Sequence, residues 1–156
     1  MGKRAVVLGA GDIGLIVARR MIQTGTEVAF IVEKQAKCGA MPGNLRSCID
    51  SYNIPLITQS TVTTLHGNAR LEAVTIVDLD EKYDIIPESE KIVECDMLLL
   101  AVGLTPELEL LSEYERKFGN KPANIAICGN AREILKMADD ISEDGASAGI
   151  NIGKIT

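Results

Sequence analysis

The sequence predicts a three-layer α/β domain in which a parallel sheet carries an added antiparallel β-meander. An aliphatic run at Arg4–Leu8 is followed by apolar residues at helical spacing and then by a second aliphatic run at 26–33. Alternation of period two begins only later, between residues 60 and 80. Strands that are apolar on both faces are typical of a buried parallel sheet, whereas alternation is typical of an antiparallel sheet with one exposed face.

The N-terminal part of the chain predicts a β-α-β unit. A strand at Arg4–Leu8 is followed by a helix from Asp12 to Thr24, which Gly25 ends, and by a strand that ends at Glu33. The apolar residues at helical spacing are Ile13, Ile16, Val17, Met21 and Ile22. Such a crossover is right-handed and joins neighbouring parallel strands, so the two strands are expected to lie side by side.

The rest of the chain predicts a third parallel strand, a meander and a helical end. We expect a short helix at 45–52, a strand at 54–58, meander strands at 60–67, 70–80 and 91–95, and a buried strand within 96–106. We then expect a helix at 107–118, a strand at Ile125–Cys128, a turn at Gly129-Asn130 and a helical segment to about Ser142. A turn at Gly67-Asn68 joins the first two meander strands.

Composition excludes several classes of function. The chain has 156 residues, 46% of them hydrophobic, with 16 Lys and Arg against 22 Asp and Glu and a net charge of -6. We expect neither nucleic acid nor an anionic membrane as a partner, because both select a basic surface. No apolar run approaches the roughly 20 residues that span a bilayer, and the first strand is too short for a signal-peptide core. We therefore expect a cytoplasmic protein.

The residues that usually bind metals or carry catalysis show no pattern of that kind. The four cysteines form no CxxC pair, so we expect free thiols and no metal site; they are Cys38, Cys48, Cys95 and Cys128. The only histidine, His66, is expected in the surface turn at Gly67-Asn68. The acidic segment 78–94 lacks the spacing of a calcium loop and is expected to be a solvated loop. No catalytic side chain is predicted.

Three glycines follow the first strand at the spacing Gly9-x-Gly11-x-x-Gly14. Gly9 permits a tight turn, Gly11 lets the backbone approach a pyrophosphate, and Gly14 lets the helix pack closely on the strand. Ala10 and Ile13 lie between them, where the free N–H groups and the positive end of the helix dipole face the phosphates. The motif predicts a Rossmann-like dinucleotide site. The alternative is that the glycines serve only the turn and the packing.

Two acidic residues and a lysine complete the predicted site. Asp12 would repel a pyrophosphate if it pointed there, so we expect its carboxylate to cap the helix. Glu33 follows the glycines by about 20 residues, at the end of the second strand, where a carboxylate accepts hydrogen bonds from ribose hydroxyls. Its charge opposes a 2′-phosphate and favours NAD(H). Lys34 and Lys37 follow and could compensate, which leaves NADP(H) as the less favoured cofactor.

Four segments resemble a known family. They are "GAGDIGLIVARRM", "LRSCIDSYNIPLIT", "CDMLLLAVGLTP" and "ICGNAREILKMADDISEDGASAG", in this order along the chain. They resemble flavoproteins with two dinucleotide domains that are related to pyridine nucleotide-disulfide oxidoreductases, especially the branch of FAD-dependent amine, opine, sarcosine and hydrogen-cyanide-forming dehydrogenase subunits. The resemblance implies an NAD(P)H-binding domain at 1–110 and, at 111–156, part of the FAD domain packed on the same unit.

The same resemblance implies further contacts and a flavin partner. Ala101, Val102 and Gly103, at the end of a strand, would lie against the nicotinamide nucleotide, whereas Gly129 and Asn130 would reach FAD. Full members carry a separate glycine motif for FAD about a hundred residues ahead of the nicotinamide domain, and none precedes this domain here. We therefore expect FAD to be carried by a missing region or a partner subunit, and exposed apolar surface to allow a homodimer.

The function predicted from these observations is an NAD(H)-binding module of a flavin-dependent oxidoreductase. It would position the nicotinamide for hydride exchange with FAD, and the cofactors carry that chemistry without a catalytic side chain. Whether the chain alone is an enzyme stays open. The alternative function is a nucleotide-sensing regulatory domain without catalysis, which would use the same glycine motif and acidic residue.

Overall fold

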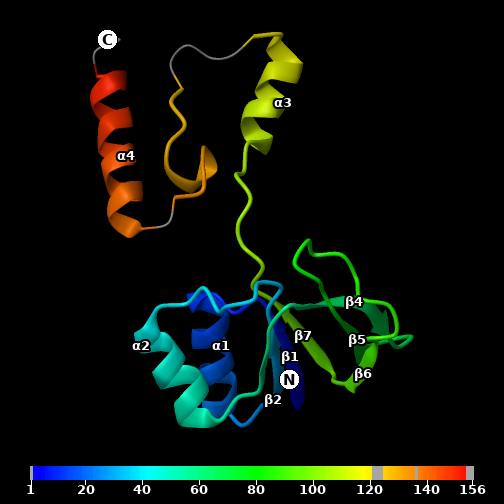
Figure 1. Ribbon diagram of the computed structural model, residues 1–156. Coiled ribbons are helices and arrows are strands. Elements are labelled where there is room, and N and C mark those ends of the chain that lie inside the picture. Colours follow the sequence, from blue (N-terminus) through cyan, green and yellow to red (C-terminus); the bar gives the residue numbers. More distant parts are fainter. Residues whose placement is uncertain (1, 121–124, 136, 154–156) are drawn as a thin grey trace. The chain divides into compact units, whose positions relative to one another are not determined.

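The computed structural model describes residues 2–120, 125–135 and 137–153, and the chain divides into two compact units, Met1–Val102 and Gly103–Thr156 (Figure 1). The boundary expected after residue 110 is of a different kind, because it separates a domain that binds NAD(P)H from a segment that resembles part of the FAD domain. That boundary stays a prediction, and so does the packing of residues 111–156 on the nucleotide-binding domain.

A parallel sheet forms the centre of the first unit. Its strands lie in the order β3 (Leu56–Ile57), β2 (Glu27–Val32), β1 (Arg4–Leu8) and β7 (Met97–Leu100). β1 therefore pairs with β2 on one side and with β7 on the other, and every pairing in this sheet is parallel. These pairings confirm the parallel strands that were predicted from the aliphatic runs. The runs are apolar throughout because both faces of the sheet are covered.

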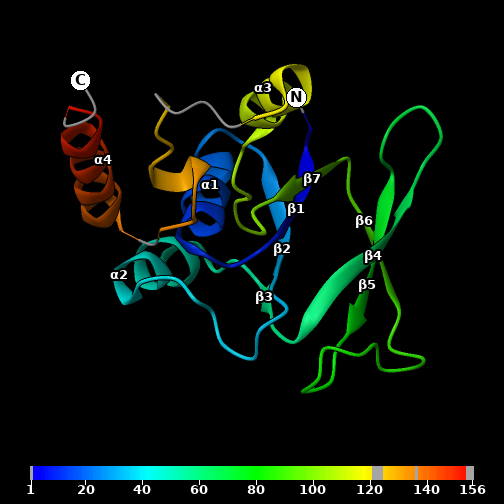
Figure 2. The ribbon, with the colours of Figure 1, turned by 90° about the horizontal axis from the view of Figure 1, so that it is seen from above.

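Helices cover one face of this sheet (Figure 2). They are α1 (Asp12–Gln23), the short α2 (Pro42–Asn44), the π-helical η1 (Leu45–Ile49) and the 3-10 turn η2 (Asp50–Tyr52). Leu15 and Ala18 of α1 belong to one buried cluster with Val7, Ile31 and Cys48. The helix predicted from residue 12 is confirmed to within one residue at its end. The helix predicted at 45–52 has the expected extent, but π and 3-10 turns replace α-helix there.

An antiparallel sheet covers the other face, in the order β4 (Ser60–His66), β5 (Ala73–Asp78) and β6 (Lys91–Glu94). Val74 and Ile76 of β5 pack with Val6, Ala29 and Val32 of the parallel sheet in a second buried cluster. Figures 1 and 2 both show α1 and α2 on one side of the parallel sheet and the antiparallel sheet on the other. The predicted fold class, a Rossmann-like three-layer domain with an added meander, is confirmed.

The sole histidine corrects one expectation about the meander. His66 was expected in a surface turn, but it is the last residue of β4 and is half-buried. Its Nε2 lies 2.7 Å from the hydroxyl oxygen of Thr75 on β5. The chain turns only after His66, with Gly67 at φ +133, and the N–H of Glu72 returns to the carbonyl of His66 at 2.8 Å. The cross-strand hydrogen bond therefore keeps the histidine in the sheet.

A carboxylate fixes the beginning of β1 beside β7. Asp96, which precedes β7, accepts hydrogen bonds from the N–H of Lys3 at 2.8 Å and the N–H of Arg4 at 2.9 Å. These backbone donors lower the pKa of the Asp96 carboxyl, because they stabilise its charged form. The neighbouring Cys95 is buried, and this burial raises the pKa of its thiol.

The second unit is helical in the part that the structure describes. It contains α3 (Glu109–Phe118), the 3-10 turn η3 (Gly129–Ala131) and α4 (Ala138–Ile152). The helix predicted at 107–118 is confirmed to within two residues at its start. The helical segment predicted after the Gly129-Asn130 turn begins only at Ala138 and runs beyond Ser142, where it was expected to end. The strand predicted at Ile125–Cys128 is wrong. A strand needs the N–H and C=O groups of a partner, and none of the described residues of this unit forms one.

Across the ranges that the structure describes, every helix is too short or too polar to cross a lipid bilayer.

Candidate functional site

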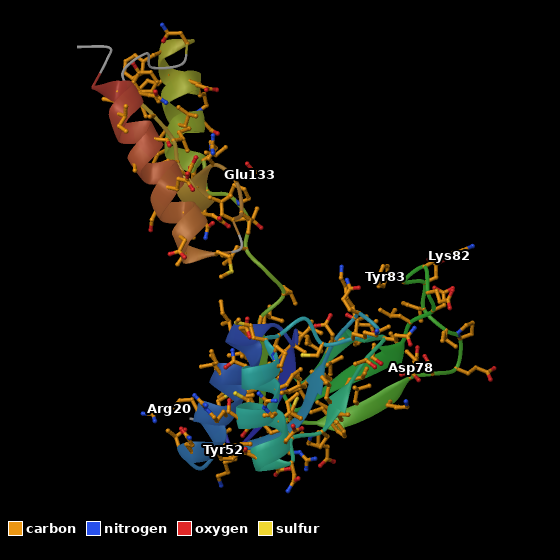
Figure 3. All side chains as sticks on the ribbon, turned by 60° about the vertical axis from the view of Figure 1, so that its left-hand side comes forward. Arg20, Tyr52, Asp78, Lys82, Tyr83 and Glu133 are labelled. Carbon is orange, nitrogen blue, oxygen red and sulfur yellow. The ribbon has the colours of Figure 1, made fainter. Side chains whose placement is uncertain are left out.

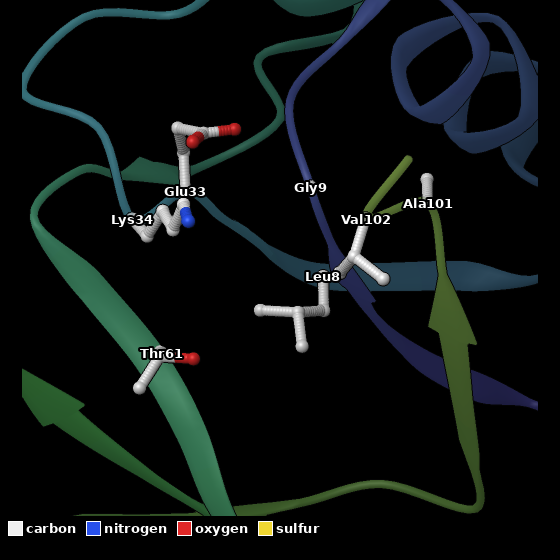
Figure 4. A pocket seen from close by; sticks show the side chains of 7 residues that line it. All are labelled: Leu8, Gly9, Glu33, Lys34, Thr61, Ala101 and Val102. Atoms are coloured by element: carbon white, nitrogen blue, oxygen red, sulfur yellow. The ribbon is translucent and has the colours of Figure 1, made fainter. Parts of the chain in front are cut away.

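The carboxyl ends of β1, β2 and β7 meet at one edge of the parallel sheet and enclose a cavity of about 170 Å³ (Figure 4). Its lining residues are Leu8, Gly9, Glu33, Lys34, Thr61, Ala101 and Val102. The chain leaves β1 toward β2 on one side, while β7 joins β1 on the other, so the strand order reverses at β1. In open α/β sheets a ligand usually binds at such a reversal, outside the carboxyl ends of the strands.

Two of the motif glycines are required by the packing of the protein itself. Gly9 has φ +107, which L side chains rarely adopt, and a Cβ there would collide with the carbonyl oxygen of Ala101. A Cβ on Gly14 would collide with the carbonyl oxygen of Gly9. These glycines let β1, β7 and α1 approach one another closely. Such contacts would be needed whether or not a ligand binds.

Gly11 differs from the other two glycines. It is the N-cap residue of α1 with φ -75, a conformation open to any residue, and a Cβ there would meet no atom within 4 Å. The N-terminus of α1 has no side-chain cap hydrogen bond, so its first N–H groups are open to an anion. Protein packing therefore does not require a glycine here, whereas a ligand close to the backbone would.

Glu33, directly after β2, binds the glycine turn through its carboxylate. Its Oε2 accepts a hydrogen bond from the N–H of Ala10 at 2.8 Å, and its Oε1 accepts one from the N–H of Gln35 at 2.9 Å. Each carboxylate oxygen has a second lone pair that a ligand hydroxyl can use. The residue is half-buried at the edge of the cavity, so its charge acts directly on whatever occupies that space.

The two lysines after Glu33 lie in different surroundings. Lys34 lines the cavity, but its Nζ lies over the ring of Tyr83, 5.4 Å from the ring centroid. Lys37 is exposed and is not one of the lining residues. From the sequence, both lysines could compensate the negative charge of Glu33. In the structure only Lys34 lines the cavity beside Glu33, and its ammonium group lies over an aromatic ring.

Asp12 does not cap α1, which corrects the expectation from the sequence. Its Oδ1 accepts hydrogen bonds from the N–H of Met41 at 2.8 Å and from Nδ2 of Asn44 at 2.7 Å. A second link joins the same two segments, because the thiol of Cys38 lies 2.8 Å from the carbonyl oxygen of Ala10. Donors that are distant in the sequence thus hold the carboxylate away from the helix N-terminus.

Sequence reasoning missed two residues of the cavity, Leu8 and Thr61. Leu8 is the last residue of β1, directly before the glycines, so its position could have indicated it. Thr61 belongs to β4 of the other sheet, and no local pattern marks it. Figure 4 shows its hydroxyl oxygen turned toward the space between the labelled side chains. The antiparallel sheet therefore adds a polar group to a site whose other residues lie at or directly after the ends of the parallel strands.

The other residues of the predicted site lie in several places. Ala101 and Val102 line the cavity at the end of β7, and the N–H of Ala101 donates to the carbonyl of Leu8 at 2.7 Å. Ile13 is in the first turn of α1 and is 66% exposed. The remaining three, Gly103, Gly129 and Asn130, belong to the second unit.

The turn at Gly129-Asn130, which was expected to reach FAD, forms hydrogen bonds within the second unit. The N–H of Gly129 donates to Oδ2 of Asp144 at 2.6 Å, and Oδ1 of Asn130 accepts from the N–H of Leu135 at 3.0 Å. Arg132 also pairs with Asp144. This turn is therefore tied to α4 of its own unit.

The comparisons with known proteins identify a family model and several similar folds. The model of the pyridine nucleotide-disulphide oxidoreductase family matches residues 1–127. The comparison with curated proteins gave no match. Among solved structures, thioredoxin reductase from T. acidophilum is 28% identical, with a TM-score of 0.59, over 71% of this chain and 34% of that one.

Two further structures match over nearly the whole chain. Thioredoxin reductase from Lactococcus lactis is 18% identical with a TM-score of 0.73, over 97% of this chain and 52% of that one. Histamine dehydrogenase from Rhizobium sp. 4-9 is 18% identical with a TM-score of 0.68, over 93% of this chain and 22% of that one. The chain therefore spans about half or less of the length of these structures.

Proposed function

Because this chain belongs to the pyridine nucleotide-disulphide oxidoreductase family, we propose that its first unit binds NAD(H) and presents the nicotinamide to an FAD carried by another region or subunit. The bound cofactors would supply the hydride chemistry. The side chains and backbone of this unit would bind the nucleotide and orient it, and no acidic or basic side chain needs to take part in the transfer.

The observation that carries this proposal is the contrast between Gly11 and its two neighbours in the motif. Gly9 and Gly14 are explained by internal packing, but Gly11 is not. A pyrophosphate that approaches the uncapped N-terminus of α1 explains a glycine at this position, since any side chain would stand in its path. The interpretation that all three glycines serve only turn and packing accounts for two of them.

Glu33 supports binding of the ribose hydroxyls. Its two carboxylate oxygens are already oriented by the N–H groups of Ala10 and Gln35, so a ribose would meet an acceptor that needs little reordering. The negative charge favours NAD(H), whose ribose carries a free 2′-hydroxyl, over NADP(H), whose 2′-phosphate would be repelled. Ala101 and Val102 then form the side of the cavity that we assign to the nicotinamide end.

We further propose that the parent enzyme belongs to the branch of FAD-dependent amine, opine, sarcosine and hydrogen-cyanide-forming dehydrogenase subunits. The support is the resemblance of residues 95–106 and 127–149 to that branch. The likeness to histamine dehydrogenase concerns the fold alone. Oxidation of NADH by the chain together with candidate flavin subunits, followed by the loss of NADH absorbance, would test this assignment.

The central experiment is calorimetric titration of the purified chain with NADH, NADPH and FAD. We expect NADH to bind more tightly than NADPH. Gly11→Val should weaken NADH binding by about tenfold to a hundredfold, because a branched side chain enters the space of the pyrophosphate. Gly43→Val is the matched control, since Gly43 also has no neighbour within 4 Å of a built Cβ and lies in α2.

The outcomes separate the alternatives clearly. Loss of binding in Gly11→Val with an unchanged melting temperature, and normal binding in Gly43→Val, would support the site. If Gly11→Val bound NADH as tightly as Gly43→Val does, the pyrophosphate would not lie against Gly11. Wild-type protein that binds neither nicotinamide nucleotide would contradict the proposed function as a whole.

A further inference from the structure

The loop between β5 and β6 brings an aromatic side chain to the residues that follow Glu33. Tyr83 lies in this loop, and its hydroxyl donates a hydrogen bond to Oε1 of Gln35 at 2.6 Å. The Nζ of Lys34 lies over the same ring at 5.4 Å from the centroid. One residue of the meander thus contacts both residues directly after Glu33.

Gln35 is also held by its backbone. Its N–H donates to Oε1 of Glu33 at 2.9 Å, and its carbonyl accepts the N–H of Gln59 at 3.1 Å. Together with the hydrogen bond from Tyr83, these contacts hold Gln35 by its N–H group, its carbonyl group and its side chain. A change at Tyr83 therefore acts on the segment next to Glu33, while the backbone contacts of Gln35 keep the carboxylate oriented.

The turn that contains Tyr83 fixes its position. Oδ1 of Asp80 accepts the N–H of Lys82 at 2.8 Å and the N–H of Asp84 at 2.9 Å. The N–H of Tyr83 donates to the carbonyl of Asp80 at 3.0 Å. Within this turn Tyr83 has φ 67, which is rare for an aromatic residue and is costly unless the surroundings impose it. The turn thus holds Tyr83 in one place over the segment 34–35.

We propose that Tyr83 determines nucleotide specificity by holding the ammonium group of Lys34 against its ring, so that the charge of Glu33 stays uncompensated and NADP(H) is disfavoured. This inference rests on the proposed binding of NAD(H) by the first unit. A cation over an aromatic face gains its stabilisation from that face, and a 2′-phosphate would have to compete with the ring for Lys34. The specificity would therefore come from the antiparallel sheet rather than from the glycine motif.

The experiment compares the ratio of the dissociation constants for NADPH and NADH in wild-type protein and three variants. Tyr83→Ala releases Lys34 and should lower the ratio by about two- to fivefold, because NADPH then binds more tightly relative to NADH. This size is expected for the loss of one exposed cation–π contact. Tyr83→Ala combined with Lys34→Met should return the ratio to the wild-type value. Lys34→Met alone should change the ratio less than twofold, because the ring already holds Lys34.

A pair of phenylalanine variants controls for the lost hydroxyl. Tyr83→Phe keeps the ring over Lys34 and should leave the ratio near the wild-type value. Tyr52→Phe is its match, because the Tyr52 hydroxyl also bonds a glutamine, accepting Nε2 of Gln23 at 2.7 Å. Figure 3 shows Tyr52 and Tyr83 at opposite sides of the first unit. A ratio that shifts as far in Tyr83→Phe as in Tyr83→Ala would overturn the role of the ring.

The remaining outcomes distinguish this inference from the function on which it rests. Wild-type protein that binds NADH, with the same ratio in Tyr83→Ala, would overturn the role of Tyr83 and leave the proposed function standing. Wild-type protein that binds neither nucleotide would overturn both. Tyr83 is 48% exposed, so melting curves are expected to show that Tyr83→Ala folds. If Tyr83→Ala does not fold, Lys34→Met alone still tests the inference, because a loss of NADPH affinity of more than twofold in that variant would overturn it.

Discussion

The two compact units differ in how their apolar side chains are placed. In the described residues, the buried apolar side chains lie between Ala5 and Cys95, all in the first unit. In the second unit neither α3 nor α4 has a buried residue, and Leu110 is 85% exposed. A cavity of about 470 Å³ with apolar lining lies beside α3 within that unit. The first unit closes its own core, and the second does not.

This difference indicates where the independent stability of the chain lies. Burial of apolar side chains is the main favourable contribution to folding, and it must exceed the conformational entropy that is lost. The first unit has two buried clusters, one on each face of its parallel sheet. In the second unit Asp144 contacts Gly129 and Arg132, but no buried apolar cluster is formed among the described residues. We therefore expect it to depend on a surface that covers its helices.

The largest effect is expected when the two units are separated. Residues 1–102 expressed alone should unfold cooperatively in urea, because both buried clusters remain intact. Residues 103–156 alone should show no cooperative transition. Circular dichroism during denaturation would measure both. A sharp transition in the second fragment would show that its helices close a core without a partner.

A pair of leucine substitutions compares the units within the whole chain. Leu15 of α1 is fully buried, so Leu15→Ala should lower the free energy of unfolding of the first unit by about 2–5 kcal/mol. Leu110→Ala removes the same atoms from an exposed side chain of the second unit and should change the free energy of unfolding of the whole chain by at most about 0.5 kcal/mol. Urea denaturation would measure both variants. Similar values would contradict the difference in burial.

A pair of glycines compares the turns of the two units. Gly9→Ala forces a Cβ into the carbonyl oxygen of Ala101 at φ +107 and should cost about 3 kcal/mol or more. Gly129 has φ +59, and its built Cβ would lie 3.3 Å from Cγ2 of Ile141, so Gly129→Ala should cost only about 1 kcal/mol. Thermal unfolding of both variants would rank them. The opposite ranking would show that β7 moves away from β1 easily.

The smallest effect concerns the acid stability of the first unit. The folded pKa of Asp96 lies below its ordinary value of 3.8, so the carboxylate contributes stability that is present above that value and is lost as the pH falls through the folded pKa. Asp96→Asn should therefore be less stable at neutral pH and lose less stability on acidification. Denaturation at several pH values, with Asp50→Asn as control, would test this. Parallel pH profiles of wild type and Asp96→Asn would contradict it.

Local patterns in the sequence were sufficient for the elements of the first unit but not for every contact. The aliphatic strands and α1 follow from periodicity, which is a local property. The predicted role of Asp12 was wrong because its donors, Met41 and Asn44, come from a distant loop. The strand predicted at Ile125–Cys128 was wrong because pairing requires a neighbour that composition cannot supply.

The candidate site divides in the same way. Gly9 and Glu33, which line the cavity, could be predicted because their spacing reflects the geometry of one β-α-β unit. Thr61 and Tyr83 could not be identified, since they belong to the meander and reach the site only through the packing of two sheets. Contacts between sheets depend on three-dimensional packing that no spacing along the chain encodes.

The place of β1 in its sheet has a consequence for the order of events during synthesis. β1 is made well before its neighbour β7, which begins only at Met97, and the hydrogen bond that closes the sheet beside the glycine turn comes from Ala101. A ribosome must therefore deliver nearly the whole first unit before the turn at Gly9 has both of its walls. Until then the nascent chain has β1 exposed along one edge. An unpaired strand edge favours aggregation, so a chaperone is expected to help the chain at this stage.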